Sequence, residues 1–349
     1  MKFSIQHATN FTNMGFGRKE VLKSAEIVDK LGCYYMTSVQ CHINWYPNEA
    51  EVFSSWIMAS ELANLTKKTN IGIMVTDVFR THPAQIALNS LHLQRLSNGR
   101  FILGLGAGEA ANLSDFGIKW DKSVSHLEEA IQYIKLLWGS NPRNKVNFEG
   151  DFFNLNKVFL QMPVPVDNPP KIWMAAGSPR TLKITAKYAD GWIPIGCTPK
   201  LYKKQLEIVN SEGREIEKAY NAFTYISKKN PERARQFMDV IACVQCLRPE
   251  IFKEYNVEVP KKLDFIEHFK IPLRKQQSHV PKAMSFAQQI PQDVRLQTVM
   301  AGSPNQIIEQ VERWQKAGCE NLCLQFWGDD YWDSIKLFAE EVIPHFKES

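Results

Sequence analysis

The stretch "GRFILGLGAGEAANLSDFG", residues 99–117, passes from an apolar strand into a turn that has a glycine at every second position. Residues 101–103 are typical of a buried strand, because a short continuous apolar run suits a strand covered on both faces. Gly106 and Gly108 remove side chains where the strand ends, so the backbone can approach a flat or phosphorylated molecule. Glu109, the carboxylate at the mouth of this turn, is therefore a candidate functional residue.

Strands and amphipathic helices alternate along the chain on both sides of this turn. Eight candidate strands are expected over residues 2–7, 34–39, 71–76, 101–106, 171–177, 191–196, 237–246 and 321–326. Among the segments between them, a long helix is expected from 199 to about 222, and a hairpin over 145–160 that turns at Glu149-Gly150. Repeated strand–helix order predicts parallel strands, and eight such units favour an α/β fold of the closed (β/α)8 type, a TIM barrel, over an open doubly wound sheet.

Residues 247–300 break this alternation, because they are polar, mixed in composition and without a repeating strand–helix pattern. The segment is expected to be a helical insertion near the carboxyl ends of the strands. The whole chain, residues 1–349, is then expected to form one barrel domain.

Composition argues against several classes of protein. The chain has 349 residues, of which 44% are hydrophobic, yet no apolar run approaches the roughly 20 residues that span a bilayer. The formal charge of +5 is spread along the chain, without the basic stripe of a nucleic-acid-binding protein. The first residues show no secretory pattern, so a cytoplasmic protein with no membrane or nucleic-acid partner is expected.

The seven cysteines are an odd number with scattered spacing, which indicates a reduced compartment rather than a disulfide framework. Cys243 and Cys246 form a CxxC pair, but on the strand expected there they would point to opposite faces. A structural zinc site needs four clustered ligands, and no second CxxC pair follows. No metal site is therefore expected.

Functional residues of a barrel lie where its strands end, and these positions carry ionisable and polar side chains here. The candidates at strand ends are His7, His42, Trp45, Thr76, Arg80, His82, Glu109, Asn112, Gly196 and Cys197. A lone histidine is usually structural, and Glu109 could simply stabilise the start of the next helix through the helix dipole. A histidine, a tryptophan and a carboxylate that all follow strands nevertheless favour an active site.

The stretch "MAAGSPRT", residues 174–181, predicts a helix that begins at Ser178-Pro179, since proline suits the first helical turn. Free backbone N–H groups at such a terminus, close to Arg180, can hold an anion. Together with the glycine turn after the fourth strand, this favours a phosphate-bearing cofactor. A Rossmann site is not expected, because GxGxGE is not GxGxxG and does not open the first strand–helix unit.

Four motifs in this order, "TDVFRTHPAQIA", "GRFILGLGAGEAAN", "AAGSPRTLKITAKYADGWI" and "NLCLQFW", resemble the bacterial luciferase-like barrel superfamily. The nearest resemblance is to its dehydrogenases and reductases that use the deazaflavin coenzyme F420. It covers nearly the whole chain and is weakest in the expected insertion. The resemblance implies hydride transfer between C5 of the deazaflavin and an alcohol or carbonyl carbon of a small molecule.

In this family, the histidine matching His42 handles the substrate oxygen, the tryptophan matching Trp45 stabilises it, and the glutamate matching Glu109 exchanges a proton near the ring. A carboxylate beside an apolar ring is expected to have a raised pKa. By the same resemblance the cofactor would be lined by Cys41, Ile73, Met74, Thr76, Ala107, Gly108, Asn112, Ala176, Gly177, Ser178, Arg180 and Thr181. The resemblance also implies a cis peptide at Ile73–Met74 and, with the apolar helix around Trp56, a homodimer.

The sequence departs from the family pattern in several places. Cys41 stands where the relatives have an aspartate, and His42 and Trp45 are three rather than four residues apart. A glutamate near the amino terminus is replaced near Met14. The cations that hold a sugar phosphate in some relatives have no clear match, although Lys200, Lys261 and Arg295 lie in the corresponding segments. Glucose 6-phosphate is therefore not the expected substrate.

Three alternatives remain open from the sequence. One is an FMN-dependent monooxygenase of the same superfamily. A second is a one-carbon enzyme similar to methylenetetrahydromethanopterin reductase, against which His42 argues because such reductases generally lack this histidine. The third is a catalytically silent barrel that only binds a cofactor or partner.

Overall fold

Eight parallel strands close into a barrel in the computed structural model, which describes residues 1–7, 17–43, 52–162, 168–328 and 331–346. In ring order they are β1 (Lys2–His7), β2 (Met36–Val39), β3 (Asn70–Thr76), β4 (Phe101–Leu105), β7 (Lys171–Met174), β8 (Gly191–Trp192), β9 (Glu217–Ile226) and β11 (Asn321–Phe326). β11 pairs with β1 through Lys2 and Asn321, which closes the ring. The prediction of a closed parallel barrel is confirmed.

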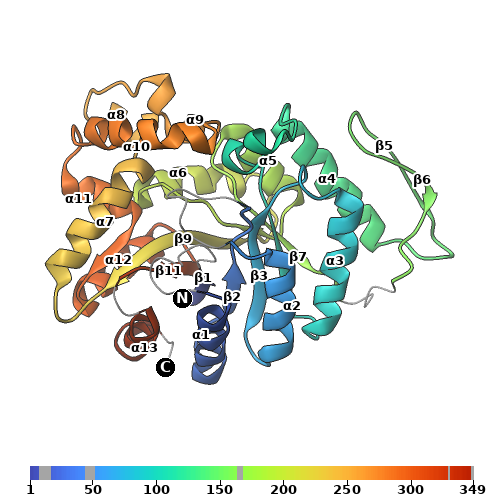
Figure 1. Cartoon of the computed structure of the whole chain (residues 1–349), viewed down its shortest axis with the longest axis horizontal. Coiled ribbons are helices and arrows are strands. Elements are labelled where there is room, and N and C mark those ends of the chain that lie inside the picture. The colour runs from blue at the N-terminus through green and yellow to red at the C-terminus, as the bar shows by residue number, and fades with distance from the viewer. Residues whose placement is uncertain (8–16, 44–51, 163–167, 329–330, 347–349) are drawn as a thin grey trace.

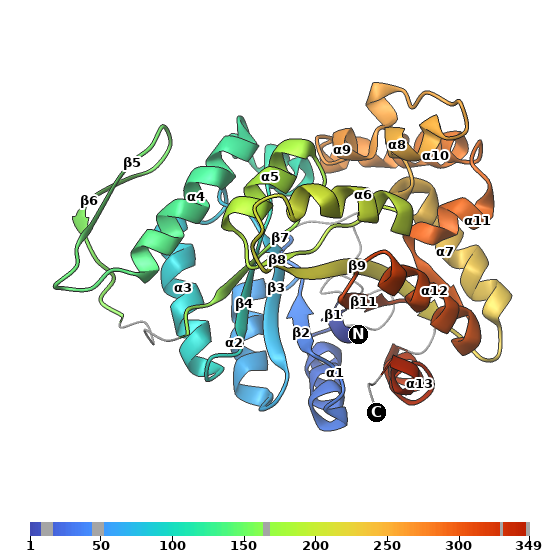
Figure 2. The ribbon, with the colours of Figure 1, turned by 180° about the vertical axis from the view of Figure 1, so that it is seen from behind.

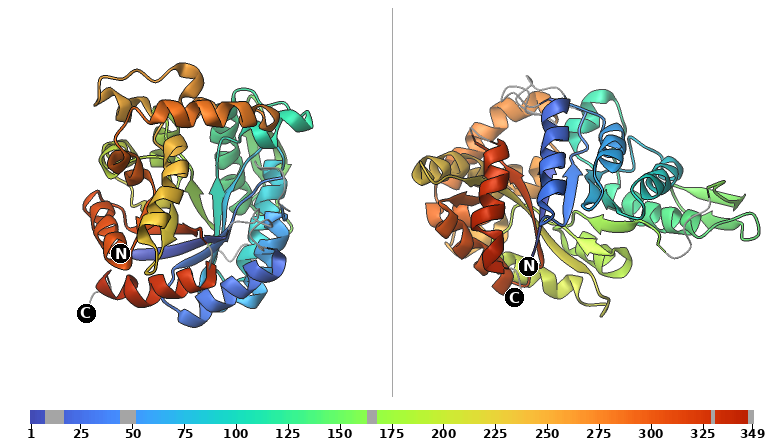
Figure 3. Two further views of the ribbon diagram at one scale, coloured as in Figure 1. Left: turned by 60° about the vertical axis from the view of Figure 1, so that its left-hand side comes forward. Right: turned by 90° about the horizontal axis from the view of Figure 1, so that it is seen from below.

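Helices surround this barrel (Figure 1). They are α1 (Arg18–Leu31), α2 (Ser55–Leu65), α3 (Pro83–Leu96), α4 (Ser123–Trp138), α5 (Pro179–Tyr188), α6 (Pro199–Val209), α7 (Pro231–Gln245), α12 (Pro304–Lys316) and α13 (Tyr331–Glu341), with short 3-10 turns η2 (Ala110–Asn112), η3 (Ser114–Phe116) and η6 (Ile343–Phe346). A proline begins five of these helices, since its fixed φ and missing N–H suit the first turn. None of the described helices is long and apolar enough to cross a membrane. Seen from below, α13 and α1 lie near the ends marked N and C (Figure 3, right).

The seventh strand was predicted in the wrong place. Residues 237–246 lie in helix α7 and its carboxyl end, and the strand is β9, inside the region expected to end a long helix. Helical period explains α7, because Ala234, Met238 and Ala242 are buried at every fourth position while Phe237 and Val240 are exposed. Helix α6 ends at Val209, and β9 is rich in aromatic residues typical of strands.

This correction changes the geometry of the CxxC pair but not its role. Cys243 and Cys246 lie three residues apart at the end of a helix, on one side of it rather than on opposite faces of a strand. Both side chains are buried, and burial raises the pKa of the Cys246 thiol to about 12. They are packing residues in the described structure.

The segment between α7 and α12 holds short helices and one strand. They are α8 (Pro249–Lys253), η4 (Lys261–Leu263), α9 (Phe265–His268), α10 (Leu273–Ala287), α11 (Gln292–Arg295), η5 (Leu296–Thr298) and β10 (Met300–Gly302), which pairs with the upper end of β9. In Figure 1 and in Figure 3 (left), α8, α9 and α10 cross the top of the molecule, the end to which the arrow of β2 points. The helices therefore lie over the carboxyl ends of the strands. That the whole chain is a single domain stays a prediction.

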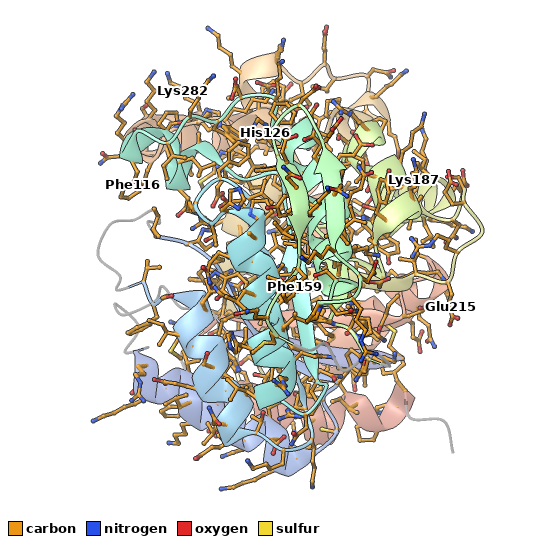
Figure 4. The ribbon with its side chains drawn as sticks, turned by 90° about the vertical axis from the view of Figure 1, so that its right-hand side faces the viewer. Phe116, His126, Phe159, Lys187, Glu215 and Lys282 are labelled. Carbon is orange, nitrogen blue, oxygen red and sulfur yellow. The ribbon has the colours of Figure 1, made fainter. Side chains whose placement is uncertain are left out.

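Two contacts hold this helical roof, residues 249–298, to the segment that follows β4. The backbone N–H of Ala110 donates to the carbonyl of Phe269 over 2.7 Å, and Arg274 pairs with Asp115 over 2.8 Å. Figure 4 shows Phe116 of η3 and Lys282 of α10 at the same end of the molecule. The roof thus touches the loop that begins with Glu109.

The predicted hairpin is present as β5 (Val146–Glu149) and β6 (Asn154–Val158), which pair antiparallel. Its turn is fixed by the Glu129 carboxylate of α4, which accepts hydrogen bonds from the backbone of Asp151 and Phe152 at 3.0 Å. Figure 2 shows the hairpin extending sideways from α4, away from the barrel. The hairpin does not contribute to the strand ends.

The interior of the barrel is not wholly apolar. His7 is fully buried between the Tyr331 hydroxyl, 2.8 Å from its Nδ1, and the Thr37 hydroxyl, 2.6 Å from its Nε2. Burial lowers the pKa of His7 to about 3, so the ring is neutral. Its ring is enclosed by packing and hydrogen bonds, which places His7 in the core rather than in an open site.

Candidate active site at the carboxyl ends of β2 and β4

A histidine and a carboxylate meet where β2 and β4 end. The Nδ1 atom of His42 lies 2.8 Å from Oε1 of Glu109, and the two side chains are 15% and 18% exposed. Asn112, fully buried in η2, donates from Nδ2 to the same Glu109 oxygen and accepts from the backbone N–H of Ile43 over 2.7 Å. This second bond fixes the orientation of the Asn112 amide, because its oxygen must face a donor. The structure therefore brings together three of the residues predicted from strand ends.

The electrostatics of Glu109 differ from the expectation. Desolvation raises its pKa, but His42, Arg80 and Asn112 together outweigh burial, and the pKa of Glu109 is lowered from its ordinary value of 4.5. The prediction of a raised pKa is wrong, since the His42 ring, the Asn112 amide and the nearby positive charge of Arg80 all favour the ionised carboxylate. Glu109 is thus ionised near neutral pH.

Arg80 and Asp77, in the turn after β3, form a second polar cluster next to the His42–Glu109 pair. Arg80 pairs with Asp77 over 2.5 Å, and its Nη2 donates to the carbonyl of Cys41 over 2.7 Å. The Cys41 thiol lies 3.4 Å from the Thr76 hydroxyl and 3.6 Å from Arg80 Nη2. Cys41 therefore occupies a polar position, beside the histidine and in reach of a guanidinium, where a carboxylate would also fit.

The peptide bond between Met74 and Val75 is cis. The expectation placed it one residue earlier, at Ile73–Met74. Both positions lie where the pairing of β3 with β4 shifts, between Ile73 and Thr76. The cis bond lies inside this shift.

The glycine turn after β4 is closely packed underneath. Gly108 has φ +81°, and a Cβ there would lie 2.9 Å from Leu113 and 3.1 Å from the Trp120 ring nitrogen. That nitrogen donates to the carbonyl of Ala107 over 2.8 Å. The turn is thus fixed from below, and only glycine fits at position 108.

The turn after β7 leads into helix α5 as predicted. Ser178 is the N-cap residue, and its hydroxyl and that of Thr181 form a reciprocal capping box, with the two oxygens 2.9 Å apart. The carbonyl of Ala176 accepts from Trp192. Arg180, expected beside the anion, instead reaches Ser125 and Glu128 at 2.9 and 3.2 Å and is mostly exposed. The capping prediction is confirmed, whereas Arg180 points to α4.

A different arginine lies against this turn. Arg248, at the start of α8, is 4% exposed, and its Nη2 and Nη1 atoms lie 3.1 and 3.2 Å from the point that a Cβ of Gly177 would occupy. Its guanidinium also stacks 4.3 Å above the ring of Phe265. Sequence reasoning missed Arg248, because a single arginine before a proline in a polar segment carries no spacing signal.

The remaining candidates lie elsewhere or outside the described residues. His82 caps α3, where its Nδ1 accepts from the backbone of Ala84. Lys200 pairs with Glu254, and Arg295 pairs with Asp239 over 2.6 Å. Trp45 and Met14 fall in segments outside the described residues, so the position of the tryptophan stays a prediction. Among the residues that the structure describes, no group of three potential metal ligands is found.

Comparison with known proteins agrees with this architecture. The family model described as luciferase-like monooxygenase matches residues 1–321. A phthiodiolone/phenolphthiodiolone dimycocerosates ketoreductase of Mycobacterium tuberculosis is 29% identical over 312 residues, 84% of this chain and 79% of that protein. An F420-dependent glucose-6-phosphate dehydrogenase of Amycolatopsis mediterranei is 28% identical over 354 residues, 95% of this chain and 96% of the relative. The fold also superposes on an F420-dependent secondary alcohol dehydrogenase with a TM-score of 0.80, at 22% identity and 99% coverage of both chains.

Proposed function

This chain belongs to the luciferase-like monooxygenase family and is an oxidoreductase, and we propose that it transfers a hydride between coenzyme F420 and the carbonyl carbon of a ketone, or the corresponding alcohol. The observation that carries the proposal is the contact of His42 with Glu109 at the carboxyl ends of β2 and β4. Relatives over most of the chain are named as a ketoreductase and an F420-dependent dehydrogenase, which supports this choice within the family.

The residues at the strand ends fit a phosphorylated deazaflavin. The turn after β4 packs closely on Val75, Leu113 and Trp120 through Gly106 and Gly108, which fixes its backbone at the strand ends where a ring would lie. The adjacent turn after β7 ends at the amino terminus of α5, where N–H groups and the helix dipole favour an anion. When bound, the deazaflavin supplies the hydride-accepting or hydride-donating carbon.

The His42–Glu109 pair would handle the proton that accompanies the hydride. The ionised Glu109 carboxylate accepts from Nδ1–H of His42, which orients the ring and directs Nε2 to the substrate side. In ketone reduction His42 gives a proton to the developing alkoxide, and in alcohol oxidation it removes one. Glu109 stabilises the charged imidazolium in both directions, and Asn112 holds Glu109 in place.

The substrate class we propose is an uncharged ketone or alcohol rather than a sugar phosphate. Of the three cations in the expected segments, Lys200 and Arg295 are already paired with Glu254 and Asp239, and Lys261 is exposed on η4. The Arg295 pair is nearly buried, so recruiting this arginine to a phosphate would leave Asp239 unpaired at a cost of several kcal/mol, about 3–5.

The assembly we propose is a homodimer in which α2 contributes apolar contact. Ile57 of α2 is 64% exposed, whereas its neighbour Met58 is buried. Light scattering at the monomer mass of 40.1 kDa over a wide concentration range would contradict this assembly.

The proposed reaction is tested by titrating the purified chain with F420 and then with a panel of ketones and alcohols, following the visible absorbance of the oxidised deazaflavin. Turnover with uncharged ketones or alcohols, and none with glucose 6-phosphate, is expected. Binding of FMN in preference to F420, with oxygen uptake, would favour a monooxygenase instead. No turnover across the panel would favour a silent barrel.

A further inference from the structure

Arg248 is a buried cation without an anionic partner. Of the described residues, no carboxylate lies within ion-pair distance of it, although its side chain is almost completely covered. Among the described residues, its guanidinium donates to two backbone carbonyls, from Nε to Gly196 and from Nη2 to Ile195, both at 2.8 Å. We propose that Arg248 is the counter-charge of the cofactor phosphate, which it meets at Gly177 in front of helix α5.

Two other arginines, the buried Arg295 and the partly buried Arg100, show how unusual this arrangement is. Arg295 is neutralised by Asp239, which accepts from both Nε and Nη2. Arg100 lacks a carboxylate partner as well, but it sits at the carboxyl ends of helices, where its nitrogens reach several backbone carbonyls that include those of Ser97 and Thr66. Such helix ends carry partial negative charge. Arg248 has five donor hydrogens and uses fewer of them, on the carbonyls of an irregular loop.

An unpaired charge in a covered position is costly, so it is normally kept where a ligand supplies the opposite charge. Burial lowers the pKa of Arg248, although the guanidinium stays charged at neutral pH. The two nearest acidic groups that act on it are Glu250 and Asp264, and Asp264 is engaged in capping α9 through Ile266. Neither forms an ion pair with the guanidinium.

The position of the guanidinium selects the ligand. Its Nη1 and Nη2 atoms are the nearest atoms to the missing side chain of Gly177, the residue before the N-cap of α5. The guanidinium fills the space that a side chain at 177 would take, and Gly177 and Ser178 are only partly covered, so a ligand can approach the backbone beside it. Two independent sources of positive potential, the helix terminus and a planar cation, converge there, which suits a phosphate ester.

The cofactor tail is the phosphate source that we favour. The turn after β7 continues the glycine turn after β4, since Ala175 donates to the carbonyl of Leu105 over 3.0 Å. The two turns are therefore adjacent, and one extended molecule can contact both. This inference rests on the proposed function, and it makes the helical roof, through its first helix, part of the cofactor site.

The test compares cofactors with and without phosphate by equilibrium fluorescence quenching. F420 and the deazaflavin alcohol that keeps only the ring and ribityl chain, and so lacks both the phosphate and the acidic tail beyond it, are titrated into wild-type protein, Arg248→Met, Arg248→Lys and Lys183→Met. Lys183→Met removes an exposed cation from the same helix and is the control. Arg248→Met should weaken F420 about 100-fold and the deazaflavin alcohol less than about threefold, the scale for losing one partner of a buried charge pair.

Arg248→Lys should lose about tenfold for F420, because an ammonium keeps the charge but not the planar fork. If Arg248→Met does not fold, as judged by circular dichroism, this variant decides. Equal weakening of both forms would mean a purely structural role, and no weakening would mean no phosphate contact; either result overturns the inference. If wild-type protein binds neither deazaflavin, the proposed function fails, and FMN with riboflavin then tests Arg248 in the same way.

Discussion

The turns after β4 and β7 lie side by side but differ in whether their charged side chains have partners of opposite charge. After β4, the carboxylate of Glu109 is matched by His42 and Asn112, and the neighbouring Arg80 is matched by Asp77. Against the turn after β7, Arg248 has no carboxylate partner in the part of the chain that the structure describes. A group of balanced charges can move a proton without bringing in counterions, whereas an unbalanced one needs a ligand to complete it. The contrast separates a region suited to chemistry from one suited to binding.

The largest effect should come from removing the charge of the balanced region. Glu109→Gln keeps the size of the side chain but leaves His42 without an ionised partner, so kcat should fall about 100-fold or more. Affinity for F420 should change by less than about threefold, because the phosphate site is untouched. Steady-state kinetics and fluorescence titration measure the two quantities. Glu320→Gln, which breaks an exposed ion pair with Lys218, is the matched control and should leave both unchanged. Normal turnover in Glu109→Gln would remove the distinction between the regions.

A smaller effect should come from crowding the Arg248 guanidinium at the turn after β7. Gly177→Ala places a methyl group 3.1 Å from Arg248, so the guanidinium must shift, and F420 should bind about tenfold more weakly, about 1.4 kcal/mol. The Tm should stay close to that of wild type, and kcat at saturating cofactor should be retained. In Gly139→Ala the nearest atom would be 3.7 Å away, an ordinary contact, and this variant should bind F420 normally. A loss of kcat without a loss of affinity in Gly177→Ala would contradict the assignment of this turn to binding.

Cys41 offers a way to sharpen the comparison, because it lies at the edge of the balanced region. Cys41→Asp restores the carboxylate of the family pattern beside His42, and the added acceptor should tighten F420 binding about threefold, the scale of one hydrogen bond. Isothermal titration with Cys41→Ser as the neutral control measures the change. Weaker binding would mean that the new carboxylate is captured by Arg80, whose Nη2 lies 3.6 Å from the present thiol.

The smallest effect concerns acid stability. The folded pKa of Glu109 lies below 4.5, so the stabilisation from its partners is present above that value and is lost as pH falls through the folded pKa. Urea midpoints measured from pH 7 down to 4 should therefore fall less steeply for Glu109→Gln than for wild type. His7 and His268, whose pKa values burial lowers to about 3 and about 4, also destabilise the fold as pH falls below 6.5. Both remain in the variant, so the difference between the two curves reports Glu109; parallel curves would contradict the pairing.

The closed barrel was predictable because strand and helix periods recur along the chain. The local prediction failed where an apolar run fits either a strand or one face of a helix. The run at 237–246 is apolar enough for a strand, and only the burial of Ala234, Met238 and Ala242 on one face shows a helix. Strand ends identified His42, Glu109 and Asn112, since topology brings such ends together. The lowered pKa of Glu109 depends on His42, Asn112 and the nearby charge of Arg80 acting on one carboxylate, and the role of Arg248 depends on a guanidinium packed against Gly177. Neither arrangement corresponds to a recognisable spacing of residues in the sequence.

The attachment of the helical roof to the loop after Glu109 has a kinetic meaning. One backbone hydrogen bond, from Ala110 to Phe269, and one ion pair between Asp115 and a largely exposed Arg274 join the two parts at this point. A hydrogen bond contributes about 1 kcal/mol net, and an exposed pair about 0–1 kcal/mol. Breaking this attachment therefore costs about 1–2 kcal/mol, which slows an opening by no more than about 30-fold. This factor applies only to a local opening beside Glu109, because the roof itself is anchored by buried side chains such as Phe252, Phe265 and Ala283.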